Sequence, residues 1–200
     1  MKNKQSCADT FSRFLRFLGC AAVVAPVLAC NGGGGGDNPL PGPSLTLVCE
    51  AGSVPDPNRI GLECPASAQG TLPVKVVIGG PSTSSDIYGV KFDLVFDGTV
   101  LHYATHSAAT SFLAKEGGSV DVLADVSESD PDRLVVAVGL KGPVSGVQVT
   151  GSMETVAEFL FQGMASGTTT VQFENGQVVD SGLNPIASLA FSGQLQVEIP

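Results

Sequence analysis

From Pro73 onward, apolar and polar residues alternate with a period of two, which is the pattern of half-buried β-strands. The clearest run is 90–96, where four large apolar residues alternate with Lys91, Asp93 and Val95. Shorter runs of the same kind lie at 74–78, 120–122, 157–161, 171–173 and 189–199. Leu134–Val138 is instead continuously apolar, which predicts a central strand covered on both faces.

Residues typical of turns separate these runs, among them Gly79-Gly80-Pro81 and Asp130-Pro131-Asp132. Asn175-Gly176 predicts a type I′ hairpin turn. No long segment has the period of a helix, and we expect at most one short helical turn within 105–115. About nine short strands within 73–199 therefore predict an all-β fold of two packed sheets.

The N-terminal segment has the parts of a secretory signal peptide. Four basic residues precede the apolar run 17–29, whose 13 residues are too few to span a bilayer, which needs roughly 20. The run ends in Val27-Leu28-Ala29-Cys30, which resembles the lipobox of bacterial lipoproteins. That resemblance implies a signal peptide at 1–29, cleavage before Cys30 and lipidation of Cys30, while an ordinary secretory signal or a chance cysteine stays open. Asn31, in place of an aspartate, favours the outer membrane.

Composition adds two points, one on the net charge of the chain after cleavage and one on the segment that follows Cys30. The chain of 200 residues has a net charge of −9. Removal of residues 1–29 takes away four basic residues and one acidic residue, so ten basic and nineteen acidic residues become six and eighteen, and the net charge becomes −12. This acidity argues against nucleic-acid binding, which needs a basic surface. Residues 30–44 are rich in Gly and Pro, and we expect a tether between a lipid anchor and a folded domain.

The five cysteines fall into three groups. Cys7 and Cys20 belong to the signal peptide, and Cys30 is the expected lipidation site. Cys49 and Cys64 remain, and two thiols in an oxidising compartment predict a disulfide that holds an N-terminal extension, residues 45–72, to the main domain. A two-cysteine metal site is the alternative, but a zinc site needs further ligands nearby.

Two stretches of the main domain resemble cohesin domains. In residues 86–101, an amphipathic strand leads to the pair Phe96-Asp97, a short turn and Leu101. In residues 156–171, an aliphatic and Phe-containing strand precedes a Gly-Thr turn and a β-branched strand. The resemblance covers residues 73–199 and implies a nine-stranded jelly-roll β-sandwich, related in shape to several carbohydrate-binding modules.

The same resemblance implies a non-catalytic module that binds a protein, since cohesins bind dockerin modules through one sheet face. Dockerin-binding members commonly have Asn or Asp at the positions of Gly89 and Lys91, and the departure at these two positions puts standard dockerin recognition in doubt. We expect the partner to be a dockerin-like or other surface protein. The candidate binding face consists of the following residues: Tyr88, Lys91, Asp93 and Val95.

A carbohydrate-binding module is the alternative function. Sugar platforms generally need flat aromatic faces, and the chain has no Trp and only two Tyr. Polysaccharide attachment therefore stays open only as weak polar binding.

Catalysis and metal binding have little support in the sequence. His102 and His106 lie four residues apart in an expected strand and loop, where isolated histidines are usually polar surface residues, and we expect no enzyme and no cofactor. Five acidic residues form a weak calcium candidate without the spacing of an EF-hand loop: Asp121, Asp125, Glu128, Asp130 and Asp132. The alternative for these residues is a solvated acidic loop that favours solubility.

Overall fold

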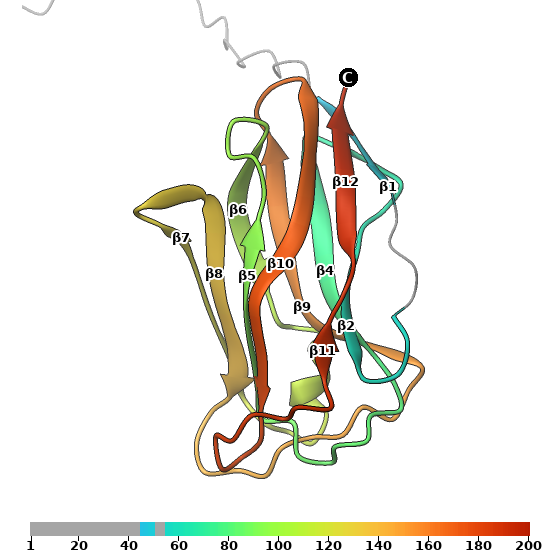
Figure 1. Ribbon diagram of the computed structural model, residues 1–200, viewed down its shortest axis with the longest axis vertical. Coiled ribbons are helices and arrows are strands. Elements are labelled where there is room, and N and C mark those ends of the chain that lie inside the picture. The colour runs from blue at the N-terminus through green and yellow to red at the C-terminus, as the bar shows by residue number, and fades with distance from the viewer. Residues whose placement is uncertain (1–44, 51–54) are drawn as a thin grey trace, which may run out of the picture. The chain divides into compact units, whose positions relative to one another are not determined.

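The computed structural model describes residues 45–50 and 55–200, and within them the chain forms twelve strands in two sheets (Figure 1). The signal peptide, Cys30 and the tether predicted from the sequence lie outside the described residues. In the order of hydrogen-bonded neighbours, the seven-stranded sheet consists of β3 (Ser67–Gln69), β1 (Thr46–Glu50), β12 (Gln194–Ile199), β10 (Gly167–Val179), β5 (Gly89–Val95), β8 (Asp130–Leu140) and β7 (Val120–Ser127).

The five-stranded sheet consists of β11 (Ala190–Phe191), β2 (Arg59–Glu63), β4 (Thr71–Gly79), β9 (Met153–Gly163) and β6 (Leu101–Ser107). A single 3-10 turn, η1 (Phe112–Ala114), lies within the segment for which the sequence predicts a short helical turn. No helix in this part of the chain has the length and apolar character needed to cross a membrane.

The structure confirms the predicted all-β sandwich, and nine strands, β4 to β12, form the part for which the sequence predicts about nine. Three further strands, β1, β2 and β3, come from the predicted N-terminal extension. β1 pairs with β12 in one sheet, and β2 pairs with β4 in the other. The extension therefore supplies strands to both layers of the sandwich.

Aromatic side chains join the two sheets at the centre of the core. Phe92 on β5 is fully buried, and its ring lies 6.0 Å from the ring of Phe159 on β9, edge to face. Phe173 and Phe191 complete the cluster, with ring centroids 5.4 and 6.0 Å from that of Phe92. Because residues of a strand alternate between its faces, the burial of Phe92 directs Lys91 and Asp93 to the outer face of the seven-stranded sheet.

The hairpin predicted at Asn175-Gly176 is wrong, because both residues lie inside β10. The pairing of β10 with β5 shifts register between Glu174 and Gln177, so the two residues form a bulge within one long strand. Asn175 has a φ of +51°, a conformation that asparagine tolerates in bulges as well as in turns. A Cβ atom on Gly176 would lie 2.2 Å from the Phe191 ring, so the glycine is needed for core packing.

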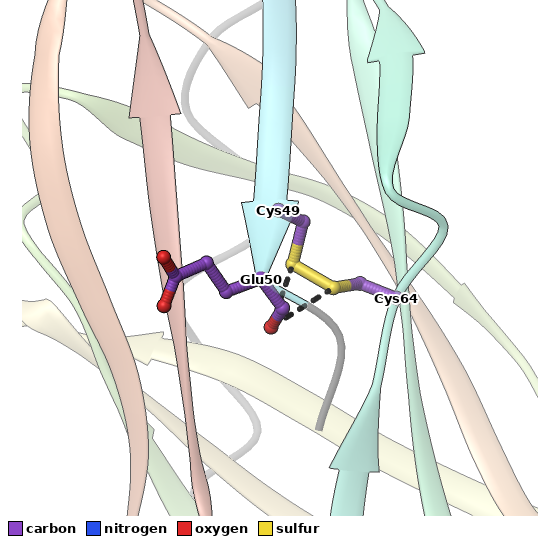
Figure 2. The surroundings of a disulfide bond; sticks show 3 residues. All are labelled: Cys49, Glu50 and Cys64. Atoms are coloured by element: carbon purple, nitrogen blue, oxygen red, sulfur yellow. Dashed lines mark hydrogen bonds between the residues drawn. A yellow bond between two sulfur atoms is a disulfide. The ribbon is translucent and has the colours of Figure 1, made fainter. Parts of the chain in front are cut away.

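The predicted disulfide between Cys49 and Cys64 is present and links the two layers (Figure 2). Cys49 belongs to β1 of the seven-stranded sheet, and Cys64 follows β2 of the five-stranded sheet, with 6.3 Å between their Cα atoms. The bridge closes a segment whose ends are 15 residues apart. It therefore restricts the unfolded chain and holds β1 and β2 to each other in the folded chain.

Loss of this disulfide is expected to destabilise the sandwich by about 3 kcal/mol, the loop-closure contribution for a loop of this length. The double variant Cys49→Ala/Cys64→Ala should then unfold roughly 6–12 °C below the wild type in calorimetry. A reductant should lower the melting temperature of the wild type and leave the variant unchanged. Equal melting temperatures for all these samples would contradict a stabilising bridge.

Candidate functional site

The outer faces of four adjacent strands form a continuous surface, which we call the sheet face. It consists of the outward residues of β10, β5, β8 and β7, which lie beside one another in the seven-stranded sheet. Cross-strand pairing arranges these residues in three rows, each of which runs in that strand order: Val179, Gly89, Gly139 and Asp121; then Gln177, Lys91, Ala137 and Leu123; then Glu174, Asp93, Val135 and Asp125.

Exposed apolar side chains gather on the β8 and β7 side of the sheet face. Leu123 is 70% exposed, Val135 is 47% exposed, and Ala137 lies exposed next to both. The expectation that Leu134–Val138 is covered on both faces is therefore wrong, because β8 has the core on one side only. Its second apolar face is a surface patch.

A shallow depression of about 310 Å³ lies next to these side chains. Gly89 and Gly139 pair with each other and line the depression, and neither has a side chain that would fill it. Apolar residues that line the depression include Leu123, Val179 and Leu183. We define the apolar patch as the following residues: Leu123, Val135, Ala137, Val179 and Leu183.

A cluster of charges adjoins the apolar patch and is centred on Arg133. Its guanidinium group binds Asp93 at 2.8 Å, Glu174 at 2.8 Å and Asp130 at 3.1 Å. These bonds, with that to Glu174 first, raise the pKa of Arg133 above its usual value. The cluster thus joins three carboxyl groups to one guanidinium group, which stays charged.

The expectation that Asp93 is exposed on the candidate binding face is wrong. Asp93 does point outward, but only 8% of it is exposed. The side chains of Arg133 and Asn175 cover it, and both donate to its Oδ2 atom, at 2.8 and 2.7 Å. Asp93 is thus a buried acceptor that orders the surface around it.

The other residues of the candidate binding face differ in their exposure. Lys91 is exposed in the middle of the sheet face, and Val95 is half-buried beyond Asp93. Tyr88 precedes β5, is half-buried beside the depression, and donates its hydroxyl to the carbonyl of Gly142 at 2.7 Å. The structure therefore brings Tyr88 and Lys91 to the depression. Sequence reasoning missed three site residues, Leu123, Val135 and Leu183. For Leu123 the available signal is an apolar residue at a position where β7 alternates to a polar face.

Asp86 fixes the loop that carries Leu183. Its carboxylate accepts the hydroxyl of Ser181 at 2.8 Å and the amide of Gly146 at 2.6 Å, so it ties the loops that follow β8 and β10 to the start of β5. The Ser181 hydroxyl first, and then the Gly146 amide, lower the pKa of Asp86. Leu183 has a φ of +62° and lies 68% exposed at the tip of this loop.

The five acidic residues of the calcium candidate belong to different strands and loops, and those with partners bind different ones. Asp121 and Asp125 belong to the outer face of β7, and Asp121 forms an exposed ion pair with Lys141 at 3.3 Å. Asp130 binds Arg133, Asp132 accepts the amide of Gly98 at 2.8 Å, and Glu128 is exposed between β7 and β8. Within residues 45–50 and 55–200, no group of three or more His, Cys, Asp or Glu side chains is placed to hold a metal ion.

The two histidines lie on opposite sides of β6. A register shift after Tyr103 turns His106 toward the core, where it contacts Phe159 and forms a hydrogen bond between its Nδ1 atom and the Tyr103 hydroxyl. His102 is exposed. Burial, together with the charge of Asp125, raises the pKa of Tyr103, so its hydroxyl stays protonated as the partner of His106. His106 is therefore a packed residue, in contrast to the surface position expected from the sequence.

Asp93 and Glu174 contact the same guanidinium group and differ in burial, which makes them a matched pair. Asp93→Ala should lower the free energy of unfolding by about 2–3 kcal/mol, because it leaves two donors without their buried charged acceptor. Glu174→Ala should cost less than about 1 kcal/mol, since Glu174 is 43% exposed in the pair. Denaturant unfolding of both variants measures the difference, and equal losses would contradict the role given to Asp93.

Asp86→Ala should release the loop of Leu183. We expect backbone amides of residues 180–185 to exchange about tenfold faster or more, because charge-assisted hydrogen bonds are lost. Asp97→Ala is the control, because the side chain of Asp97 accepts bonds from Thr99 within its own turn and lies away from the loop of Leu183. Because the pKa of Asp86 is lowered in the folded state, its stabilising effect is complete above its ordinary pKa and is lost as the pH falls below that value. Unchanged exchange at neutral pH would contradict the clamp.

Comparison with known proteins supports the fold. No family model and no curated protein matches the chain. Among solved structures, the second type II cohesin module of the ScaA scaffoldin of Acetivibrio cellulolyticus is 18% identical, with 68% of this chain and 88% of that chain covered and a TM-score of 0.51. Another type II cohesin domain from the cellulosome of the same organism is 15% identical, with 70% and 94% covered and a TM-score of 0.51.

A third solved structure, a type II cohesin–X–dockerin complex from Acetivibrio cellulolyticus, contains a chain that is 17% identical to this one. The match covers 68% of this chain and 93% of that chain, with a TM-score of 0.51. The predicted likeness to cohesins is thus confirmed at the level of the fold: the described residues form a cohesin-like β-sandwich.

Proposed function

We propose that this chain is a lipid-anchored, extracytoplasmic, non-catalytic module that binds another protein through the sheet face. The apolar patch is the observation that carries this proposal. Leu123 and Leu183 are 70% and 68% exposed, and a surface of this kind is typical of a protein contact. The charged residues around the patch match the polar rim of such contacts.

The surface under the patch is ordered, which favours binding. Asp93 holds Arg133 and Asn175, and Asp86 holds the loop of Leu183. A partner that contacts ordered side chains loses less conformational entropy on binding than one that must first fix them. The sheet face is therefore suited to a rigid contact.

The depression defines what the partner must supply. Gly89 and Gly139 form its floor, and Gly89 occupies a position where dockerin-binding cohesins commonly have a polar residue. An apolar side chain of the partner fills this space better than a polar one, because the lining is mostly apolar. The partner we propose is a dockerin-like or other surface protein that presents an apolar residue at this point.

The carbohydrate alternative gains no support from the described aromatic residues. The hydroxyl groups of Tyr88 and Tyr103 are engaged by Gly142 and His106, and both tyrosines are half-buried. Phe92, Phe159 and Phe161 are buried. Stacking on a pyranose ring needs an accessible aromatic face. We therefore propose a protein, and not a polysaccharide, as the partner.

The anchor is part of the proposal because the lipobox resemblance and the disulfide agree. A disulfide between Cys49 and Cys64 suits an oxidising compartment outside the cytoplasm. Lipidation of Cys30 would hold the module at a membrane, and the 14 residues 31–44 span at most roughly 50 Å. Asn31 makes the outer membrane the proposed location.

Charge placed in the apolar patch should abolish partner binding without unfolding the module. In Leu123→Lys/Val135→Lys, two exposed side chains change and Lys at 135 stands between Asp93 and Asp125, so we expect a melting temperature near that of the wild type and at least about a tenfold loss of affinity. Val48→Lys is the control, since Val48 is 41% exposed on β1 of the same sheet, outside the sheet face. The measurement is retention of extracellular proteins of the source organism on immobilised residues 31–200.

Insoluble polysaccharides are tested in parallel by depletion. Retention by polysaccharide alone, with no protein captured, would overturn the proposed function. Equal capture by the wild type and the double variant would place the contact elsewhere on the module.

A further inference from the structure

β7 is an edge strand with unpaired backbone groups. It is the last strand of the seven-stranded sheet and pairs only with β8 (Figure 1). The amide of Lys141 donates to the carbonyl of Ser119 at 2.8 Å, so Ser119 and alternate residues after it bond toward β8. The amide and carbonyl groups of Val120, Val122 and Ala124 therefore point away from the sheet, and no hydrogen bond joins them to another described element.

Apart from the charges of Asp121 and Asp125, this edge lacks the features that usually prevent strand addition. Natural edge strands are often short, contain Pro or Lys, or are interrupted by bulges. β7 has eight residues without Pro or Lys, and its one register shift lies at its end, after Val126. Its backbone is thus open to pairing along Val120–Asp125.

The charges on β7 disfavour a second copy of the chain at this edge. In an antiparallel pairing centred on Leu123, Asp121 of each copy lies opposite Asp125 of the other. Like charges directly opposite each other destabilise a strand pair. The ion pair of Asp121 with Lys141 does not remove this charge, because both side chains are at least half exposed. A strand with basic residues at these two places satisfies the charges instead.

The inward face of β7 adds apolar surface beside the edge. Val120, Val122 and Ala124 are only half-buried, whereas the inward residues of β8 are buried. A cleft of about 450 Å³ adjoins them, lined by Val120 and Val122 of β7, by His106 of β6 and by the residues that follow β6. Side chains on the inner face of an added strand would cover this surface.

We propose that β7 accepts one further antiparallel strand from another protein, with a basic–x–apolar–x–basic pattern. The basic residues lie opposite Asp121 and Asp125, and the apolar residue lies opposite Leu123. The x residues are apolar, because they face the half-buried side of β7 and the cleft. The backbone groups at the edge carry this contact, and its outward side chains adjoin Leu123 of the apolar patch. Loss of the backbone bonds, as opposed to loss of side chains on the sheet face, therefore distinguishes it from the contact proposed there.

The probe for this proposal is a capped, dye-labelled peptide of sequence Thr-Lys-Val-Leu-Val-Lys-Thr, and the measurement is fluorescence anisotropy with residues 31–200. A peptide in which both Lys are replaced by Glu should bind at least about tenfold more weakly than the lysine peptide. Val122→Pro should weaken binding of the lysine peptide at least about tenfold, because it removes the outward amide of residue 122. The substitution leaves the hydrogen bonds between β7 and β8 in place, since that amide does not point toward β8. Val122→Thr keeps that amide and should bind as the wild type does.

A second probe tests the same backbone hydrogen bonds without any change to the protein, in case Val122→Pro does not fold. It is the lysine peptide methylated on the backbone nitrogens that face β7. It should bind at least about tenfold more weakly than the unmethylated peptide. The proposal is overturned if the wild type does not bind the lysine peptide, or if the methylated peptide binds equally well. A dimer of the wild type that Val122→Pro disrupts would assign the edge to a second copy and would also overturn it.

Discussion

The burial of Phe92 between the two sheets determines most of what lies on the outer surface. Its ring meets Phe159 of the opposite sheet, which fixes which face of β5 points inward. A shift by one residue would expose this ring and bury Lys91. With Phe92 inward, Asp93 must face outward, and the pairing of β5 with β8 and β10 brings Arg133 and Asn175 to it. One core contact thus leads to the ordered charge cluster.

The two proposed contact surfaces share β7 and use different parts of it. Outward side chains such as Leu123 belong to the sheet face, while the outward amides of Val122 and Ala124 belong to the edge. Strand geometry separates the two, since side chains stand perpendicular to the sheet and backbone groups lie within it. The backbone groups of the edge are thus distinct from the sheet face, and the two contacts adjoin at the side chain of Leu123.

Sequence reasoning is sufficient for the elements that local alternation defines. The strands around Phe92 and Phe159 and the bridge between Cys49 and Cys64 follow from residue pattern and compartment chemistry. The burial of Asp93 does not follow, because its partner Arg133 is 40 residues away in the sequence.

The apolar patch shows a second limit of sequence reasoning. The continuous run around Val135 has the composition of a strand covered on both faces, but no element covers its outer face among the described residues. Asn175-Gly176 is compatible with a turn and with a bulge, and the contact of Gly176 with Phe191, which depends on tertiary packing, decides between them. Both errors concern features that depend on neighbours distant in sequence.

The most direct test of the sheet face is the protection of one engineered thiol by the captured partner. Leu123→Cys places a thiol in the apolar patch, and Val48→Cys places one on the same sheet outside it. We expect the partner to slow maleimide modification of the first thiol and to leave the second unchanged. Modification of the Leu123→Cys thiol at the same rate with and without bound partner would contradict a contact through the sheet face.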